Sequence, residues 1–201
     1  MTSIESRLRR RDDEVAATER AARAFRERAA REELIDIAYG WVDTPVGRML
    51  AAATDEGLLR LGFESERVDV TLAELARKVS PRILQDERRL ERIRRQLGEY
   101  FEGRRKAFDM PLDRSLIQGF HRQVLDATER IPYGAVSTYR EVAERAGNAR
   151  ASRAAGNALG SNPIPIVIPC HRVLRTGGGL GGYGGGLDRK QLLLQLEGVG
   201  L

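Results

Sequence analysis

The sequence predicts an α+β protein: a small N-terminal antiparallel sheet with helices, followed by a mainly helical domain. Residues 35–63 alternate apolar and polar side chains between turn signals, which is typical of strands joined by tight turns. Later segments repeat apolar residues at helical spacing and are separated by Gly, Asn and Pro. We expect a helical extension over 1–33, an α/β domain over 34–113 and a second domain over 114–201.

The extension is predicted to be a single helix. Ile4, Leu8, Val15, Ala22 and Phe25 fall near one helical face among dense Arg and Glu. Opposite charges three and four positions apart support such a helix locally. Because its positive and negative charges nearly cancel, we favour a packing or solvated helix over a DNA-binding arm.

The second segment, 34–113, is predicted to begin with an antiparallel meander and to continue with helices. Apolar residues at 90, 93, 97 and 101 support the later helix. The expected strands are 35–42, 49–54, 58–63 and an edge strand at 108–112, and the expected helices are 68–79 and 87–101.

The third segment, 114–201, is predicted to be mostly helical. A helix ends near 131–134, and Thr138 with Glu141 has the spacing of a capping box that starts the next one. A Gly-containing turn separates that helix from another at 150–159, which is the helix-turn-helix pattern, although helical hairpins without DNA share it. We also expect a short buried strand at 166–168 and a terminal helix at 187–196.

Composition describes a soluble globular chain, with 41% hydrophobic and 31% charged residues. No apolar run approaches the roughly 20 residues of a membrane span, and the charged start lacks a secretory core. A lone cysteine suits a reducing compartment, so we expect a cytoplasmic protein.

The net charge of +5 is concentrated in the second half of the chain. Residues 140–175 hold six arginines against two acidic residues. Such a cluster indicates a polyanionic partner, whereas a solvated arginine-rich surface explains it equally well. Charge alone therefore leaves nucleic-acid binding open.

Cys170 is the single cysteine, so it cannot form an internal disulfide or a structural zinc site alone. Buried free cysteines are usually inert. However, His171 follows directly, and a thiolate forms most readily beside a cation or a proton acceptor. Neighbouring side chains of a regular strand face opposite ways, so direct contact between the two needs an irregular backbone or an intervening water.

Several motifs together carry a family resemblance. They are the helix pair, Asn162-Pro163-Ile164-Pro165, Pro169-Cys170-His171-Arg172-Val173, Gly182-Tyr183-Gly184-Gly185 and Glu197-Gly198. This combination resembles the O6-alkylguanine-DNA alkyltransferases, the methylated-DNA–protein-cysteine methyltransferase family. The resemblance is dense over 116–199, looser over 35–112 and absent from 1–33.

The resemblance implies single-turnover transfer of the alkyl group from O6-alkylguanine, and less well from O4-alkylthymine, to Cys170. A thiolate suits attack on a saturated carbon. By resemblance, His171 removes the thiol proton through a water, Glu197 polarises His171, and Asn162 ties the active-site turn. Tyr139 matches the tyrosine that rotates the phosphate and gives a proton to the leaving guanine. Without the resemblance, Glu197 is an ordinary surface acid and Asn162 a turn residue.

The resemblance also implies that the damaged base is flipped out of the duplex. Arg153 matches the intercalating finger, and Ala154 and Gly156 are small enough for close approach to the minor groove. Arg150 and Tyr139 complete the implied DNA-binding residues. An exposed arginine on a packing helix is the plainer alternative. The implied substrate pocket consists of Pro165, Val173, Tyr183, Gly184 and Lys190.

No cofactor is expected, and no metal, because the cysteines that hold zinc in some members are lacking. The implied partner is double-stranded DNA carrying O6-alkylguanine, bound through the minor groove by a protein that is monomeric in solution. The main alternative is a non-catalytic lesion-binding protein that recruits excision repair; in those proteins the cysteine is replaced. A cysteine hydrolase and a transcriptional regulator with an added zinc domain fit less well.

Overall fold

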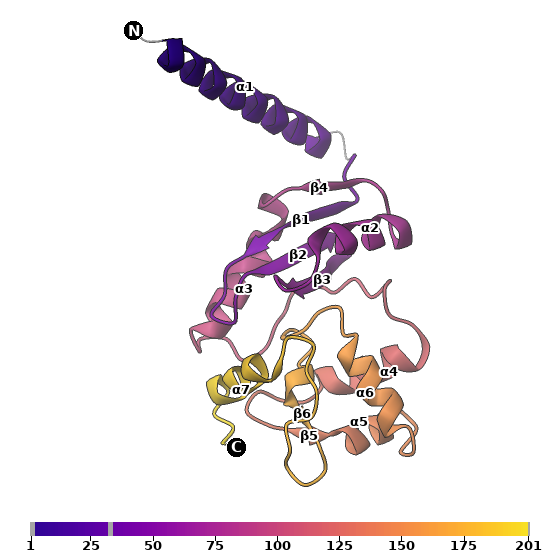
Figure 1. Cartoon of the computed structure of the whole chain (residues 1–201). Helices are drawn as coiled ribbons and strands as arrows, with labels where there is room; N and C mark the ends of the chain where they lie inside the picture. Colours follow the sequence, from indigo (N-terminus) through magenta and orange to yellow (C-terminus); the bar gives the residue numbers. More distant parts are fainter. Residues whose placement is uncertain (1–2, 32–33, 201) are drawn as a thin grey trace.

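The computed structural model describes residues 3–31 and 34–200 and confirms the α+β class (Figure 1). Its first element is α1 (Ser3–Arg31), a long helix that projects away from the rest of the chain (Figure 1). Leu8, Val15 and Phe25 on this helix are exposed, whereas Ala29 near its end is buried. Most of the described helix is thus solvated; residues 32–33 of the predicted helix lie outside the described part.

A four-stranded sheet follows, and three of its strands form the predicted meander. The strand order is β3-β2-β1-β4, with β1–β2 and β2–β3 antiparallel and β1–β4 parallel. The fourth strand was not predicted, because its three residues are too few to display an alternating pattern. The strands are β1 (Ile37–Val42), β2 (Met49–Thr54), β3 (Gly57–Phe63) and β4 (Ile83–Gln85).

The edge strand predicted at 108–112 was wrong. The segment makes one isolated bridge, in which Leu58 donates its N–H to the carbonyl of Pro111 and accepts from Asp113. A longer ladder cannot form there because Pro111 has no N–H to donate. The segment instead runs alongside β3 and leads into the second half of the chain.

Two helices cover the sheet on opposite faces. Leu75 of α2 (Val68–Lys78) packs with Ile37, Ala52 and Leu59 in a small cluster. The other face packs on η1 (Arg88–Leu90) and α3 (Glu91–Phe101), which together occupy the predicted helix at 87–101. The core on that side continues without interruption into the C-terminal half, where it reaches Cys170.

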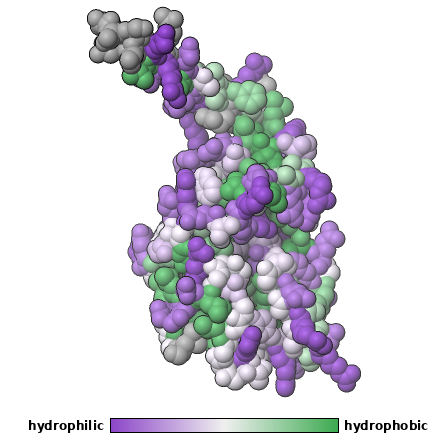
Figure 2. Space-filling model, viewed as in Figure 1, coloured by the Kyte–Doolittle hydropathy of each residue, from purple (hydrophilic) through white to green (hydrophobic). Residues whose placement is uncertain are grey.

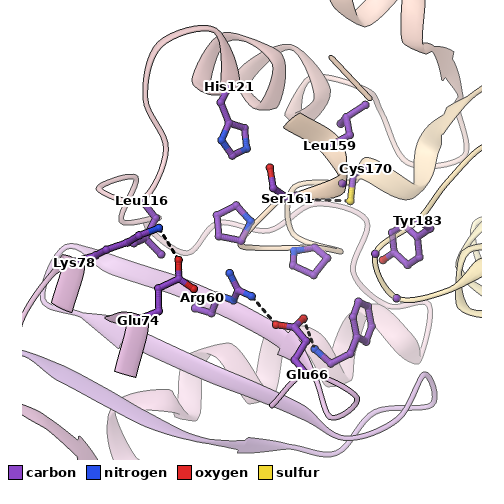
Figure 3. A pocket seen from close by; sticks show the side chains of 17 residues that line it. Arg60, Glu66, Glu74, Lys78, Leu116, His121, Leu159, Ser161, Cys170 and Tyr183 are labelled. Atoms are coloured by element: carbon purple, nitrogen blue, oxygen red, sulfur yellow. Dashed lines mark hydrogen bonds and ion pairs between the residues drawn. The ribbon is translucent and has the colours of Figure 1, made fainter. Parts of the chain in front are cut away.

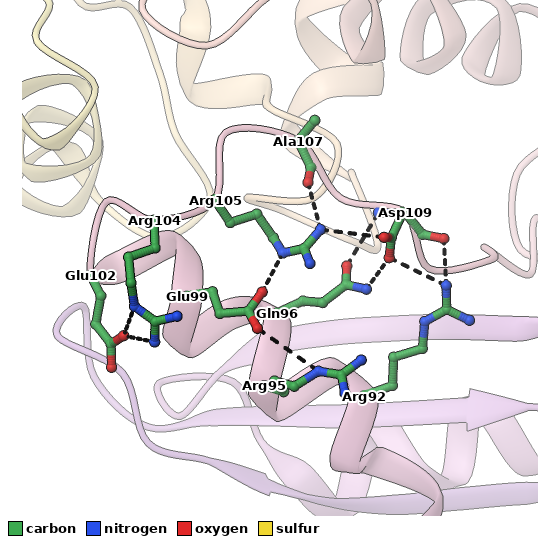
Figure 4. A network of polar contacts seen from close by, with 9 residues as sticks. All are labelled: Arg92, Arg95, Gln96, Glu99, Glu102, Arg104, Arg105, Ala107 and Asp109. Atoms are coloured by element: carbon green, nitrogen blue, oxygen red, sulfur yellow. Dashed lines mark hydrogen bonds and ion pairs between the residues drawn. The ribbon is translucent and has the colours of Figure 1, made fainter.

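The outer face of α3 carries a polar network that holds the chain after the helix (Figure 4). Arg105 donates to Glu99 at 2.7 Å, and Arg92 donates to the carbonyl of Asp109 at 2.7 Å. Gln96 accepts from the Asp109 N–H at 3.2 Å and donates to its carboxylate. This network fixes the path by which the chain leaves the sheet.

The C-terminal half is mainly helical, as predicted. Thr138 and Glu141 form the expected capping box, in which each side chain accepts from the other residue's N–H. The pair α5 and α6 forms the predicted helix-turn-helix, with α4 packed on both. The helices are α4 (Gly119–Glu129), α5 (Tyr139–Arg145), α6 (Ser152–Gly160) and α7 (Leu187–Leu196).

The buried strand predicted at 166–168 was also wrong. These residues form a turn closed by a hydrogen bond from the Ile168 N–H to the Ile164 carbonyl at 2.9 Å. Pro165 cannot donate to a ladder, and Ile166 has a φ of 74° that no strand tolerates. The turn leads into η2 (Cys170–Arg172), and β6 (Val173–Leu174) then pairs in parallel with β5 (Ser137–Thr138).

The visible surface is largely hydrophilic, with smaller hydrophobic areas between hydrophilic residues (Figure 2). Among the described residues, no helix has the length and apolar character needed to cross a membrane.

Candidate active site

Cys170 begins a short 3₁₀ turn and is almost fully buried, with 6% of its surface exposed. Asn162 fixes this turn from the end of α6. Its side-chain amide donates to the Ile168 carbonyl at 2.9 Å and to the Cys170 sulfur at 3.1 Å, and its oxygen accepts from the Ile164 N–H at 3.0 Å. One side chain therefore organises the loop and touches the nucleophile.

The loop before Cys170 contains a strained residue. Ile166 has a φ of 74°, in the left-handed region that β-branched residues avoid. Such a conformation costs on the order of 1–3 kcal/mol and persists where the surroundings enforce it. Here Ile166 is fully buried and Asn162 clamps both sides of it, so packing holds the loop in place.

His171 follows the thiol in sequence and is buried together with Glu197. The His171 Nε2 lies 3.0 Å from Glu197 Oε1, and both side chains are fully buried. Because a carboxylate accepts only, Nε2 carries the proton and Nδ1 of the neutral ring is an acceptor. His171 Nδ1 is buried and has no protein partner.

Glu197 is held by further donors from distant parts of the chain. Tyr100 donates to Oε1 at 2.7 Å, and Arg172 donates to both carboxylate oxygens at 2.8 Å. Burial raises the pKa of Glu197, but the hydrogen bonds from His171 and Arg172 outweigh burial and hold the pKa at about 2. Burial lowers the pKa of His171, so the imidazole is neutral before reaction.

The thiol itself is protonated at rest. Burial raises the pKa of Cys170 to about 11, against an opposing contribution from the Asn162 hydrogen bond. A thiol in this environment needs a base to become nucleophilic. The neutral His171 ring, whose sequence neighbour is the thiol, offers that base.

A cavity of about 490 Å³ opens onto Cys170 beneath α6; we call it the α6 cavity. Tyr139 and Arg153 line it from the helix pair, and Tyr183 and Gly184 line it from the glycine-rich loop. The Tyr139 hydroxyl donates to the Gly182 carbonyl at 3.2 Å and accepts from the Gly182 N–H at 3.1 Å. Burial raises the pKa of Tyr139, so its hydroxyl remains a proton donor.

The glycine-rich loop closes tightly against Tyr139. Gly181 has a φ of 68°, and a Cβ there would lie 2.6 Å from the Tyr139 hydroxyl. Any side chain at this position would push the loop away from the cavity. Lys190 holds the same loop from below, because its buried amine donates to the carbonyls of Val173 and Leu180.

Two protein-family models match most of this chain. Residues 37–114 match the family model of the 6-O-methylguanine DNA methyltransferase ribonuclease-like domain, and residues 119–199 match that of the DNA binding domain. The methylated-DNA–protein-cysteine methyltransferase of Methanosarcina acetivorans is 39% identical over 160 residues, which are 80% of this chain and 97% of that protein. The chain belongs to the 6-O-methylguanine DNA methyltransferase family. The family and the activity predicted from the sequence are thereby confirmed.

Other family members agree in sequence and fold. The Mycolicibacterium paratuberculosis methyltransferase is 41% identical over 163 residues, 80% of this chain and 92% of that protein. The crystal structure of the Mycobacterium tuberculosis O6-methylguanine methyltransferase superposes with a TM-score of 0.69 at 35% identity, and covers 80% of this chain and 92% of its own. The same organism's protein has been solved in complex with DNA, with the same agreement.

The structure brings most of the predicted site residues of this methyltransferase around the thiol. Those that contact Cys170 or His171 or line the α6 cavity are Asn162, Glu197, Tyr139, Arg153, Gly156, Tyr183 and Gly184. Arg150, just before α6, and Ala154, in its first turn, are exposed and do not line the cavity. Their part in DNA binding stays a prediction.

Three predicted pocket residues lie elsewhere. Val173 and Lys190 are fully buried and line neither cavity at Cys170. Their contribution to a substrate pocket is therefore indirect. Lys190 has a pKa that burial lowers to about 8. Pro165 lines a second cavity that also reaches Cys170.

The sequence analysis missed Tyr100, whose hydroxyl donates to the Glu197 carboxylate across 97 positions of sequence. Its apolar neighbours on α3 marked it as part of a helix, and no local pattern identifies such a distant partner. Among the described residues, no group of three or more His, Cys, Asp or Glu side chains is arranged to hold a metal ion.

Proposed function

We propose that this methyltransferase repairs DNA by moving the alkyl group of an O6-alkylguanine onto the sulfur of Cys170, once per molecule. The observation that carries the proposal is the buried Cys170 thiol, which lines the α6 cavity and is followed by a neutral His171 held by Glu197. A thioether is stable to the groups present, so each molecule reacts a single time.

The first step is formation of the thiolate. His171 Nδ1 takes the Cys170 proton through one water, because Nε2 is occupied by Glu197. The resulting imidazolium is stabilised by the Glu197 carboxylate beside it. Asn162 donates to the sulfur and stabilises its negative charge.

The second step is displacement at the alkyl carbon. A carbon–sulfur bond forms to Cys170, and the bond between that carbon and guanine O6 breaks. Guanine leaves with the electron pair and takes a proton from Tyr139, whose hydroxyl lies at the glycine-rich loop that lines the α6 cavity. The phenolate then recovers a proton from solvent, and the product is intact guanine in DNA.

The helix pair supplies the duplex contacts. Arg153 is exposed on α6 and also lines the α6 cavity, which suits a finger that fills the space left by a flipped base. Because Ala154 and Gly156 have small side chains or none, this surface of α6 can enter the minor groove. Arg150, exposed before α6, contacts the phosphates.

The chain is organised as two units and an N-terminal extension. The unit over 34–113 supports a DNA-binding and transferase unit over 114–201, while 1–33 forms an extension outside both family matches. The protein acts as a monomer in the cytoplasm, where its free thiol stays reduced.

A DNA-side assay tests this proposal. Duplex with one O6-methylguanine is incubated with the protein, and the base composition is measured after digestion. We expect guanine to appear in amounts equal to the active protein and no further. Binding without loss of O6-methylguanine would instead make the protein a non-catalytic lesion binder, and continued turnover would make it a hydrolase.

A further inference from the structure

Arg189 of α7 joins the glycine-rich loop to the N-terminal sheet. Its Nε donates to the carbonyl of Val46, in the turn between β1 and β2, at 2.6 Å, and its Nη1 donates to the carbonyl of Gly185 at 2.8 Å. The guanidinium also lies 5.0 Å from the centre of the Phe63 ring at the end of β3, as in a cation–π contact. Gly47 has a φ of 104°, and a Cβ there would lie 3.3 Å from Arg189 Nη2, so the turn closes tightly over the guanidinium. One half-buried side chain thus connects segments 143 positions apart.

Phe63 extends this connection to the wall of the active site. It is buried, and its ring centre lies 6.0 Å from that of Tyr183 with the planes at 69°, which is an edge-to-face pair. A Cβ at Gly185 would lie 2.5 Å from the Phe63 ring, so only glycine lets the loop approach this closely. Phe63, Tyr183 and Gly185 all line the second cavity at Cys170, whose volume is about 540 Å³ (Figure 3). The N-terminal sheet therefore forms part of the wall beside the thiol.

The loop that bears Tyr183 is anchored on both sides of this residue. Before it, the backbone of Gly182 exchanges two hydrogen bonds with the Tyr139 hydroxyl. After it, the Gly185 carbonyl accepts from Arg189. The Tyr183 hydroxyl itself has no hydrogen-bond partner among the described residues, so packing and these two anchors position the ring. Without Arg189, no side-chain hydrogen bond of the described residues would hold the loop between Tyr183 and α7.

We propose that Arg189 is a positioning residue for alkyl transfer, which fixes Tyr183 beside Cys170 by holding the glycine-rich loop against the N-terminal sheet. This rests on the proposed function and adds a residue to the same site. Arg189 lines neither cavity at Cys170, so it acts through Gly185 and Phe63. A wall fixed in advance keeps the reacting atoms aligned, and a misplacement of about 1 Å can slow a reaction roughly 100-fold. The N-terminal sheet thus contributes to the reaction without supplying a reacting group.

Arg189→Met tests this proposal, because it keeps the aliphatic stem and removes the charge and the donors. Single-turnover methyl transfer from duplex carrying O6-methylguanine should fall by about 10- to 100-fold at saturating protein. Affinity for undamaged duplex should change by less than about 2-fold, since Arg189 lies outside the helix pair that supplies the phosphate contacts. Arg189→Lys, which keeps the charge but not the planar fork that reaches two carbonyls, should restore part of the transfer rate.

The reactivity of the thiol toward iodoacetamide separates positioning from general damage to the site. His171 and Asn162, rather than Tyr183, determine the reactivity of the sulfur. In Arg189→Met the thiol should therefore react with iodoacetamide no more slowly than in the wild type, and with the same pH profile. Equal slowing of methyl transfer and of this reaction would overturn the positioning role, as would methyl transfer at the wild-type rate.

Phe63→Leu examines the same contact from the sheet. It removes the ring that contacts both Arg189 and Tyr183, so it should give the same selective loss of methyl transfer, and the double variant should lose less than the product of the two effects. This variant keeps the test decisive if Arg189→Met does not fold. Gln191→Met is the matched control, because Gln191 is exposed on α7 and lines neither cavity; it should leave all rates unchanged. A wild-type chain that transfers no methyl group would instead overturn the proposed function, so the two failures are distinguishable.

Discussion

The guanidinium of Arg172 donates hydrogen bonds to both oxygens of the Glu197 carboxylate, with Nε 2.8 Å from Oε2 and Nη2 2.8 Å from Oε1. Both side chains are buried, and Arg172 also donates to the Ile131 carbonyl at 2.5 Å. The pair links the active-site turn to the residue after α7. Glu197 therefore stabilises the fold through Arg172 and also holds His171 by a hydrogen bond.

Glu197→Gln should destabilise the protein by about 3 kcal/mol. The substitution leaves the buried Arg172 without a counter-charge, which is far costlier than removing an exposed pair. Urea unfolding at neutral pH measures the change. Glu102→Gln, in the exposed pair with Arg104, is the control and should change the free energy of unfolding by no more than about 0.5 kcal/mol. Equal effects of the two substitutions would contradict the role given to Arg172.

Acid should destabilise the wild-type protein in two stages. Burial lowers the pKa of His171 below the ordinary value of 6.5. Below about pH 6.5, therefore, His171 binds a proton in the unfolded state but not in the folded state, and the folded state loses stability. The pKa of Glu197 is about 2 in the folded state and ordinarily 4.5, so its contribution is complete above pH 4.5 and is lost toward pH 2. Unfolding free energies measured from pH 7 to 3 should therefore fall continuously. In Glu197→Gln the loss of stability below pH 4.5 should be smaller than in the wild type, although carboxyls such as Asp36 and Asp109, whose pKa values are also lowered, still contribute to it. A loss of the same size in both proteins would contradict the assignment to Glu197.

The elements that sequence patterns predicted are those governed by local physics. The capping box at Thr138, the helix of Leu90, Ile93 and Leu97 and the meander all depend on side chains a few positions apart. The mistaken strand at 166–168 arose because apolar character alone does not reveal a left-handed Ile166.

The site was predictable only in part for a similar reason. The thiol and its neighbouring histidine are adjacent in sequence, and the family resemblance supplied Asn162 and Glu197. Tyr100 and the second cavity at Cys170 could not be predicted, because each depends on packing between the two halves of the chain. Arg60 and His121, which both line that cavity, are 61 positions apart in the sequence.

Arg153→Ala and Tyr139→Phe should slow repair of duplex DNA more than reaction with free O6-benzylguanine. The free base needs no flipping, so loss of an inserted arginine does not affect it. Tyr139→Phe should also slow the free base modestly, because it removes the proton donor. Single-turnover rates on both substrates give the comparison, with exposed Arg77→Ala on α2 as control. Equal slowing of both substrates by Arg153→Ala would make that residue structural.

Binding to undamaged duplex should depend strongly on salt and weakly on sequence. If three to five phosphates are neutralised by the arginines of 140–175, the log–log slope is roughly −2.7 to −4.5 by counterion release. Deleting residues 1–33 should barely change this slope, because the charges of that segment nearly cancel. Titrations of both proteins across salt concentrations measure it. A collapse of the slope on truncation would show that α1 binds DNA.

The mass of the protein after reaction tests the central claim most directly. The chain is incubated with duplex carrying a single O6-methylguanine, digested, and its peptides are weighed. The account predicts that the peptide containing Cys170 gains the mass of one methyl group and that Cys170→Ser gains none while still binding the duplex. An unmodified Cys170 peptide from a reaction that has restored guanine, or a methyl group on another residue, would contradict it.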